Sequence, residues 1–369
     1  MILLLSLLVA FFVCFLLVRF NSLHAHLSND HTDAGPQKFH SQPTPRVGGL
    51  AIAMGLLAAY FYLIYTHASI LREFGYLLLA AIPAFAGGLI EDLTKKVSVT
   101  KRLVLSMISA GFGAWLLNAV VTHLGVAPLD WLLQWPIVAI ALTLFAVGGV
   151  VNAVNIIDGF NGVVGGFACL MLLAIAAVSF ELQDSFLLTA ALVMLGAVFG
   201  FLVWNYPYGK IFLGDGGSYL VGFWLAELAV LVVARHSEVS PWFAALLLVH
   251  PVCETFFSVY RRKYLQGKSP WDPDGLHLHT LVFRRLNHTR WHMNSNVHHK
   301  VLCNSMTAPY FWIMKALTVS VAVCFWDNSL VLITFTGLFV YFYIWIYWRI
   351  VRFKAPRWMI KRNNYGGRI

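Results

Sequence analysis

The chain has 369 residues, of which 59% are hydrophobic and 11% charged, and its formal net charge is +10. Soluble domains average roughly 45–50% apolar and about 25% charged residues, so this composition excludes an ordinary soluble protein and indicates a membrane protein. In a membrane protein, excess base sets orientation and attracts anionic membrane lipids, so we expect no nucleic-acid partner.

Apolar runs long enough to cross a hydrocarbon core of about 30 Å predict an all-α polytopic membrane protein with about eleven transmembrane helices. The first run lacks a basic n-region and a small-residue cleavage site, so we expect an uncleaved span there. The predicted spans are residues 2–20, 48–66, 75–92, 103–122, 132–152, 162–180, 186–204, 217–234, 240–260, 309–326 and 329–350.

The distribution of Lys and Arg predicts how these spans are oriented. With the N-terminus outside, the inner segments contain 23 Lys and Arg residues, whereas the outer loops contain only Arg72 and Arg235. This bias predicts an outer N-terminus and a cytoplasmic C-terminus. We expect a transmembrane domain over residues 1–351 with a cytoplasmic loop at 261–308, followed by a basic cytoplasmic tail at 352–369 that lies on anionic headgroups.

Residues 87–96, Gly-Gly-Leu-Ile-Glu-Asp-Leu-Thr-Lys-Lys, end the third predicted span. The adjacent acids Glu91 and Asp92 each make ionisation of the other more costly unless a cation is close, and Lys95 follows three residues after Asp92. The pattern is typical of a site that handles charged groups. An interfacial cap with snorkelling lysines explains it equally well.

Residues 152–162, Asn-Ala-Val-Asn-Ile-Ile-Asp-Gly-Phe-Asn-Gly, lie at the inner end of the fifth predicted span. Asn152, Asn155 and Asp158 are spaced by three and would share one face of a helix. Polar groups at this depth are costly against lipid, so we expect them to face protein, water or a ligand. Simple hydrogen bonding between helices is the alternative interpretation.

Residues 212–218, Phe-Leu-Gly-Asp-Gly-Gly-Ser, precede the eighth predicted span. The glycines leave backbone amides free around Asp215, and the following helix directs its positive end at the loop. This combination favours the binding of a phosphate together with its metal ion. An ordinary turn is the alternative, because Gly-Asp-Gly is also common in turns.

Residues 268–279 end in His277-Leu278-His279. In an extended segment the two imidazoles point the same way, and with Arg284 and Arg285 nearby they favour an anionic phosphate ligand. The later histidines follow no spacing with cysteine or carboxylate that supports zinc, so we expect a solvated loop. They are His288, His292, His298 and His299. All four motifs fall on the predicted cytoplasmic face.

Together with Pro43-Thr44-Pro45-Arg46-Val47-Gly48-Gly49, these motifs resemble the polyprenyl-phosphate N-acetylhexosamine-1-phosphate transferases over roughly residues 38–285. The family includes undecaprenyl-phosphate GlcNAc-1-phosphate transferases and MurNAc-pentapeptide transferases. The resemblance implies Mg²⁺ as cofactor, with Mn²⁺ as a substitute, bound by Asp215 and Asp92. It implies that the catalytic residues are Glu91, Asp92, Asp158 and Asp215. It also implies that the substrate-binding residues are Lys95, Asn152, Asn155, His277, His279, Arg284 and Arg285.

Two positions depart from the family pattern. Glu91 stands where relatives carry the first of two aspartates, which adds a methylene to that side chain. Thr280 follows His279 where relatives often carry another histidine. Because MurNAc-pentapeptide transferases usually show consecutive histidines, that subgroup is the less expected alternative.

The resemblance implies transfer of an N-acetylhexosamine-1-phosphate, by default GlcNAc-1-phosphate, from a UDP-sugar to undecaprenyl phosphate, with release of UMP. It implies a bacterial inner-membrane enzyme with a cytoplasmic site that starts a lipid-linked cell-envelope polysaccharide such as O-antigen. A phosphate monoester has its second pKa near 6, so we expect Glu91 and Asp92 to position acceptor and cation more than to abstract a proton. A covalent aspartyl intermediate, the identity of the sugar and a homodimer stay open.

A transporter is the alternative from another functional class. Such a protein would place ionisable groups near the bilayer midplane along a pathway. Only Glu227 lies well inside a predicted span, with Glu254 and Lys315 nearer its inner side. The sequence therefore favours the enzyme.

Overall fold

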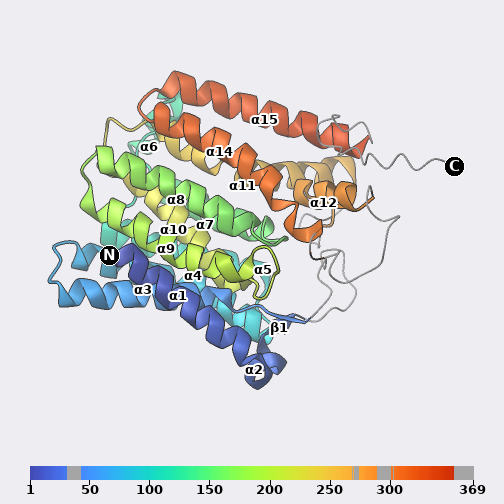
Figure 1. Cartoon of the computed structure of the whole chain (residues 1–369). Helices are drawn as coiled ribbons and strands as arrows, with labels where there is room; N and C mark the ends of the chain where they lie inside the picture. The colour runs from blue at the N-terminus through green and yellow to red at the C-terminus, as the bar shows by residue number, and fades with distance from the viewer. Residues whose placement is uncertain (31–42, 268, 270–273, 289–300, 302, 353–369) are drawn as a thin grey trace.

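The protein is described by a computed structural model that places residues 1–30, 43–267, 269, 274–288, 301 and 303–352 (Figure 1). The described strands are two short segments that pair antiparallel, and nearly everything else is helical, which confirms the all-α prediction. The elements in chain order are α1 (Ile2–Arg19), α2 (Asn21–Ser28), β1 (Asn29–Asp30), β2 (Thr44–Pro45), α3 (Gly48–Tyr65), α4 (Leu71–Thr94), α5 (Val99–Leu117), α6 (Ala127–Leu133), α7 (Pro136–Ile156), α8 (Val163–Glu181), α9 (Ser185–Asn205), α10 (Gly214–Arg235), α11 (Pro241–Tyr260), η1 (Arg261–Leu265), α12 (Leu278–His288), α14 (Ala308–Cys324) and α15 (Ser329–Val351).

Ten of the described helices have the length and apolar composition to cross a membrane. The remaining predicted span, residues 103–122, corresponds to α5, whose first turn contains the charged residues Lys101 and Arg102. These charges lower the mean hydropathy of α5 below that of its neighbours. The helix nevertheless runs beside α10 along the bundle, because Arg102 contacts Asp215 near one end and Gly113 contacts Glu227 eleven residues later.

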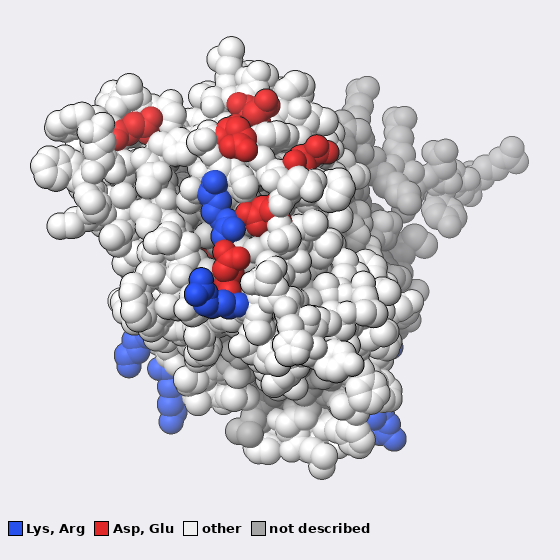
Figure 2. Space-filling view, turned by 90° about the vertical axis from the view of Figure 1, so that its left-hand side faces the viewer, with Lys and Arg blue, Asp and Glu red and all other residues white. Residues whose placement is uncertain are grey.

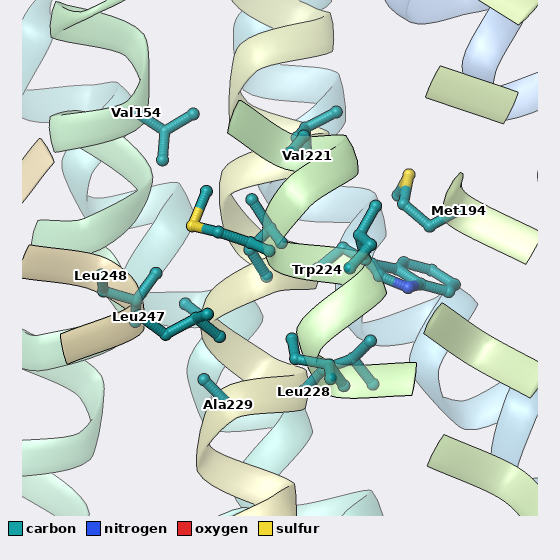
Figure 3. Packing of buried hydrophobic residues seen from close by; sticks show 14 of the residues in the cluster. Val154, Met194, Val221, Trp224, Leu228, Ala229, Leu247 and Leu248 are labelled. Atoms are coloured by element: carbon teal, nitrogen blue, oxygen red, sulfur yellow. The ribbon is translucent and has the colours of Figure 1, made fainter. Parts of the chain in front are cut away.

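The bundle is built around α10, whose side chains are almost all buried. Helices α3, α4, α5, α7, α8, α9 and α11 all contact it (Figure 1). Trp224 lies in this interior (Figure 3), edge-on to Phe74 of α4 at 5.8 Å between ring centroids. Its indole N–H donates to the Ala190 carbonyl of α9 at 3.1 Å. Because lipid is as apolar as the helix surfaces, such packing and interhelical hydrogen bonds are what hold membrane helices together.

Arg235 lies at the C-terminal end of α10, far from Asp215, and joins three helices. Its Nε donates to Asp184 Oδ2 at 2.8 Å, and its Nη1 donates to Glu73 Oε1 at 2.7 Å. Asp184 also accepts the Leu187 amide at 3.0 Å and thereby caps the N-terminus of α9. Figure 2 views this end of the molecule, where a small group of charged side chains lies on a mostly uncharged surface. We call Glu73, Asp184 and Arg235 the Arg235 clamp.

α1 begins and α15 ends at opposite ends of the bundle (Figure 1). This is the arrangement that an odd number of crossings produces. Which end faces the cytoplasm stays a prediction. The predicted tail beyond Arg352 lies outside the described residues, as do His292, His298 and His299.

Candidate active site

Glycine-bearing segments meet backbone to backbone where α3 and α10 begin and α4 ends. A Cβ on Gly49 would lie 2.3 Å from the Gly217 nitrogen, and a Cβ on Gly88 would lie 2.4 Å from the Asp215 carbonyl oxygen. The Gly49 amide also donates to the Leu213 carbonyl at 2.9 Å. Glycine is therefore required at positions 49 and 88, because any side chain would push the segments apart.

Asp92 caps the N-terminus of α10 from the end of α4. This carboxylate is 1% exposed, and its Oδ1 and Oδ2 accept the amides of Asp215 at 2.9 Å and Gly216 at 2.8 Å. Helix α10 begins at Gly214, earlier than predicted, so these amides belong to its first turn. The prediction that they are free to bind a phosphate is wrong, because an internal carboxylate already meets these donors and the positive end of the helix dipole.

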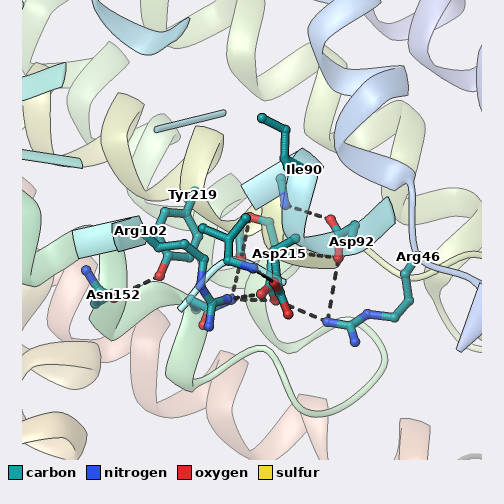
Figure 4. A network of polar contacts seen from close by, with 12 residues as sticks. Arg46, Ile90, Asp92, Arg102, Asn152, Asp215 and Tyr219 are labelled. Atoms are coloured by element: carbon teal, nitrogen blue, oxygen red, sulfur yellow. Dashed lines mark hydrogen bonds and ion pairs between the residues drawn. The ribbon is translucent and has the colours of Figure 1, made fainter. Parts of the chain in front are cut away.

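Arg46 and Arg102 lie beside the carboxylate of Asp215 (Figure 4), and Asn155 also donates to it. Its Oδ1 accepts from Arg46 Nη2 at 3.0 Å and from Asn155 Nδ2 at 3.1 Å, and its Oδ2 accepts from Arg102 Nη1. Arg46 Nη2 also lies 3.7 Å from Asp92 Oδ1. The side chain of Asp215 is 12% exposed, so the two guanidinium groups compensate a mostly buried charge. Guanidinium groups match phosphate oxygens in geometry, so the pair can also receive an anionic substrate.

Asn152 and Asn155 lie on one face of α7, as predicted, and both contact α10. The Tyr219 hydroxyl donates to Asn152 Oδ1 at 2.8 Å, and Asn155 Nδ2 donates to Ser218 Oγ at 2.8 Å. Asp158 does not share that helix, because α7 ends two residues before it and the chain turns there. The prediction of three groups on one helix face is therefore wrong for Asp158. Hydrogen bonding between helices accounts for part of the motif.

The carboxylate of Asp158 lies close to Asp92 and Asp215. Among the residues that the structure describes, none donates a hydrogen bond to this carboxylate. Burial raises the pKa of Asp158 to about 7, with the charges of Asp215 and Asp92 acting in the same direction and Arg46 opposing them. The negative field of two neighbouring carboxylates makes this group ready to accept a proton or a cation.

Glu91 and Lys95 shape the turn that follows α4. Glu91 Oε2 accepts the Val97 amide at 2.7 Å, so its longer side chain fastens the turn six residues ahead. Lys95 ends the helix with a left-handed φ of 56° and an exposed side chain. A catalytic role for Glu91 and substrate binding by Lys95 stay predictions.

The histidine motif borders the turn that contains Asp158. The rings of His277 and His279 are stacked, 5.2 Å apart at an interplanar angle of 21°, which confirms that they point the same way. His277 Nδ1 lies 3.0 Å from Oε1 of the buried Glu254 on α11, and a Cβ on Gly159 would lie 3.0 Å from His279 Nε2. Burial, reinforced by His277, lowers the pKa of His279 to about 3, so this imidazole is neutral at pH 7.

Three site residues escaped assignment from the sequence, namely Arg46, Arg102 and Glu254. Arg102 entered the sequence analysis only as an orientation signal, and Arg46 only as an orientation signal and as a member of the motif at residues 43–49. Nothing local separates a site arginine from one that sets orientation. The signal for Glu254 was a lone acid two turns before the end of an apolar span. Arg284 is exposed and Arg285 is half-buried on α12, and their contact with substrate stays a prediction.

Residues 74–233 match the model of glycosyl transferase family 4. The chain is therefore similar to this family from α4 to α10. The region that matches glycosyl transferase family 4 contains Asp92, Asn155, Asp158 and Asp215, which meet where α4 and α7 end and α10 begins.

Similar proteins carry concordant names. The chain is 29% identical over 259 residues to the undecaprenyl-phosphate alpha-N-acetylglucosaminyl 1-phosphate transferase of Escherichia coli (strain K12), with 67% of each chain covered. It is 31% identical over 274 residues to the decaprenyl-phosphate N-acetylglucosaminephosphotransferase of Mycolicibacterium smegmatis, with 65% of each covered. It is 29% identical over 253 residues to the probable undecaprenyl-phosphate N-acetylglucosaminyl 1-phosphate transferase of Bacillus subtilis (strain 168), with 66% of each covered.

Proposed function

We propose that this protein transfers GlcNAc-1-phosphate from UDP-GlcNAc to undecaprenyl phosphate and releases UMP. One observation carries the proposal. At one end of a membrane bundle, Asp215 is held between Arg46 and Arg102 and lies near the Asp158 carboxylate, to which no described residue donates a hydrogen bond. The names of the similar proteins support this donor and acceptor. None of those names supports the MurNAc-pentapeptide alternative.

We propose Mg²⁺ as the cofactor because the carboxylates suit the way in which this ion binds. Mg²⁺ takes one or two carboxylates together with substrate phosphates and water, rather than a full protein cage. Among the described residues, no group of three or more His, Cys, Asp or Glu is placed so that it could hold a metal ion by itself, whereas Asp158 and Asp215 offer two neighbouring carboxylates. These two residues would hold the ion, and it would withdraw charge from the diphosphate. Asp92 as a direct ligand stays a prediction, since its two oxygens accept backbone amides and its side chain is only 1% exposed, against 12% for Asp215.

The reaction joins two anions, and the protein's task is to reduce their repulsion. An oxygen of the lipid phosphate forms a bond to the sugar-bearing phosphorus of UDP-GlcNAc, and the bond from that phosphorus to the oxygen of UMP breaks. Arg46 and Arg102 would attract the phosphate groups and stabilise the charge that develops on them. His277, whose ring is oriented by Glu254, would contact the diphosphate in addition to the two arginines. The buried Asp92 keeps α10 in place, which is a positioning role.

An apolar groove supports a polyprenyl acceptor. It has a volume of about 910 Å³ and is lined by α7, α10, α11 and α15. Its lining extends from Pro241, where α11 begins, to Tyr260, where α11 ends, and it includes Val150, two residues before Asn152. A lipid tail in this groove would remain in the bilayer while its phosphate reaches Asp92, Asp158 and Asp215, which we call the acidic cluster.

We place the enzyme in the bacterial inner membrane with the Asp215 end in the cytoplasm, where nucleotide-sugars occur. The excess of Lys and Arg in the segments at that end supports this orientation. A cytoplasmic site would begin a lipid-linked cell-envelope polysaccharide on the inner leaflet. Anionic membrane lipids are the partners expected for the basic inner surface.

Release of UMP by the purified protein in lipid nanodiscs tests this function. We expect release with UDP-GlcNAc, undecaprenyl phosphate and Mg²⁺, and loss of release with EDTA or in Asp215→Asn. Asp327→Asn removes an exposed carboxylate before α15, outside the acidic cluster, and is expected to behave like wild type. Absence of release with UDP-GlcNAc, UDP-GalNAc and UDP-glucose, or equal release from Asp215→Asn, would contradict the proposal.

A further inference from the structure

The inner half of α11 anchors the histidine motif. Glu254, Ser258 and Arg261 are spaced by four and three residues and therefore lie on one face of the helix. Glu254 Oε1 lies 3.0 Å from His277 Nδ1, Ser258 donates to Asp274 Oδ2 at 2.7 Å, and Arg261 donates to the same Asp274 oxygen. The direction of α11 beyond its midpoint therefore decides where residues 274–279 lie.

A proline interrupts α11 immediately before this anchoring face. Pro251 lies inside the helix and has no N–H, so the carbonyl of Leu247, four residues earlier, lacks its helical partner. The side-chain nitrogen of Lys315, on α14, donates to this carbonyl. Lys315 is 1% exposed, and its Nζ also lies 6.0 Å from the centroid of the Phe167 ring. A buried carbonyl left without a donor would cost free energy, and Lys315 removes that cost.

We propose that Lys315 is a positioning residue for the transferase reaction. Lys315 donates to the Leu247 carbonyl, which Pro251 leaves without a helical partner. This bond fixes the geometry of α11 at the proline and, through Glu254, the position of His277. The bond also explains why a lysine is buried within a membrane span. The transporter alternative would instead place this lysine on a transport pathway. The catalytic consequence rests on the proposed function, whereas the structural coupling between Lys315 and Pro251 does not.

A double-mutant cycle on the full-length protein in nanodiscs separates these two parts. Lys315→Met removes the donor and keeps an unbranched apolar chain, while Pro251→Ala restores an N–H that can satisfy the Leu247 carbonyl within the helix. Ile313→Met, at a position 65% exposed on the same helix, serves as the control. The readouts are the thermal midpoint, hydrogen–deuterium exchange of residues 274–280, and the KM and kcat of UMP release.

We expect Lys315→Met to lower the thermal midpoint and to speed exchange in residues 274–280. Its KM for UDP-GlcNAc should rise about tenfold, the effect of losing one hydrogen bond, with a smaller change in kcat. Adding Pro251→Ala to Lys315→Met should restore the thermal midpoint but not the KM, because the proline geometry is lost. If Lys315→Met alone does not fold, the double variant is still expected to fold.

Three results would overturn the proposal. They are additive effects of the two substitutions on the thermal midpoint, unchanged exchange in residues 274–280 of Lys315→Met, and a double variant that is no more stable than Lys315→Met. Absence of UMP release from the wild-type protein would instead contradict the proposed function, and the thermal and exchange results would still decide the role of Lys315.

Discussion

At the scale of single residues, Gly88 permits the closest backbone approach between α4 and α10. A Cβ at this position would lie 2.4 Å from the Asp215 carbonyl oxygen, a distance that real Cβ atoms do not adopt. We expect Gly88→Ala to force the helices apart, to destabilise the protein by about 1–3 kcal/mol and to lower UMP release at least tenfold. Thermal unfolding and initial rates in nanodiscs measure both effects.

Gly111 provides the matched control for this substitution. It lies within α5, and a Cβ there would have no atom within 4 Å. Gly111→Ala is therefore expected to leave the rate unchanged and to leave stability unchanged or slightly raised, since alanine favours helix over glycine by about 0.5–1 kcal/mol. Equal loss of activity in the two variants would show that the contact with Asp215 is not what Gly88 provides.

At the scale of elements, the N-terminus of α10 depends on a carboxylate from another helix. Asp92→Ala would leave the amides of Asp215 and Gly216 without their acceptor, and we expect a destabilisation of about 1–3 kcal/mol. Asp92→Asn retains an acceptor oxygen and should keep UMP release within about tenfold of wild type. A loss of about 10³-fold in Asp92→Asn at wild-type thermal stability would instead identify an essential base or nucleophile.

The Arg235 clamp links stability to pH at the other end of the bundle. Burial alone would raise the pKa of Asp184, but the Leu187 amide, His236 and Arg235 together hold it below its usual value. A carboxylate with a lowered folded-state pKa stabilises the fold above its unfolded pKa of about 3.9, and this contribution is lost as pH falls through the folded value. We therefore expect Asp184→Asn to have a lower thermal midpoint than wild type at pH 7, with the difference shrinking below about pH 4.

Asp327→Asn is the comparison for the clamp, because Asp327 is exposed and lies outside it. Its thermal midpoint should follow the wild-type curve from pH 7 to pH 3 within error. A constant difference between Asp184→Asn and wild type across this range would mean that ionisation of Asp184 contributes nothing to stability.

The long helices were predictable from the sequence, whereas the short helices α2, α6 and α12 and the contacts between helices were not. Apolar runs bounded by charge identify the long helices because the bilayer sets their length, and only α5, with Lys101 and Arg102 in its first turn, falls below the others in apolar character. The bond from the Asp215 amide to Asp92 joins residues 123 positions apart, and no local pattern encodes it. The spacing of Asn152, Asn155 and Asp158 suggested one helix face, but spacing cannot show that α7 ends at Ile156.

At the scale of the whole molecule, the chemistry lies at one end of the bundle and the apolar groove extends toward the other. Ala245 is an exposed residue near the start of α11 that lines this groove far from Asp215. A bulky side chain there would narrow the groove without touching the acidic cluster. The effect of such a change should therefore depend on how far along the groove the acceptor's lipid tail reaches.

We expect Ala245→Trp to raise the KM for undecaprenyl phosphate several-fold while leaving the KM for UDP-GlcNAc unchanged. Farnesyl phosphate, whose tail of three isoprene units is much shorter than that of undecaprenyl phosphate, should be used equally well by the variant and the wild type. Leu173→Trp, on the exposed face of α8 and outside the groove, should leave the KM for both acceptors unchanged. The two acceptors share the same phosphate chemistry and differ in the length of the tail. An equal rise in both KM values would therefore mean that the tail lies elsewhere and that Ala245→Trp acts by a general disturbance of α11.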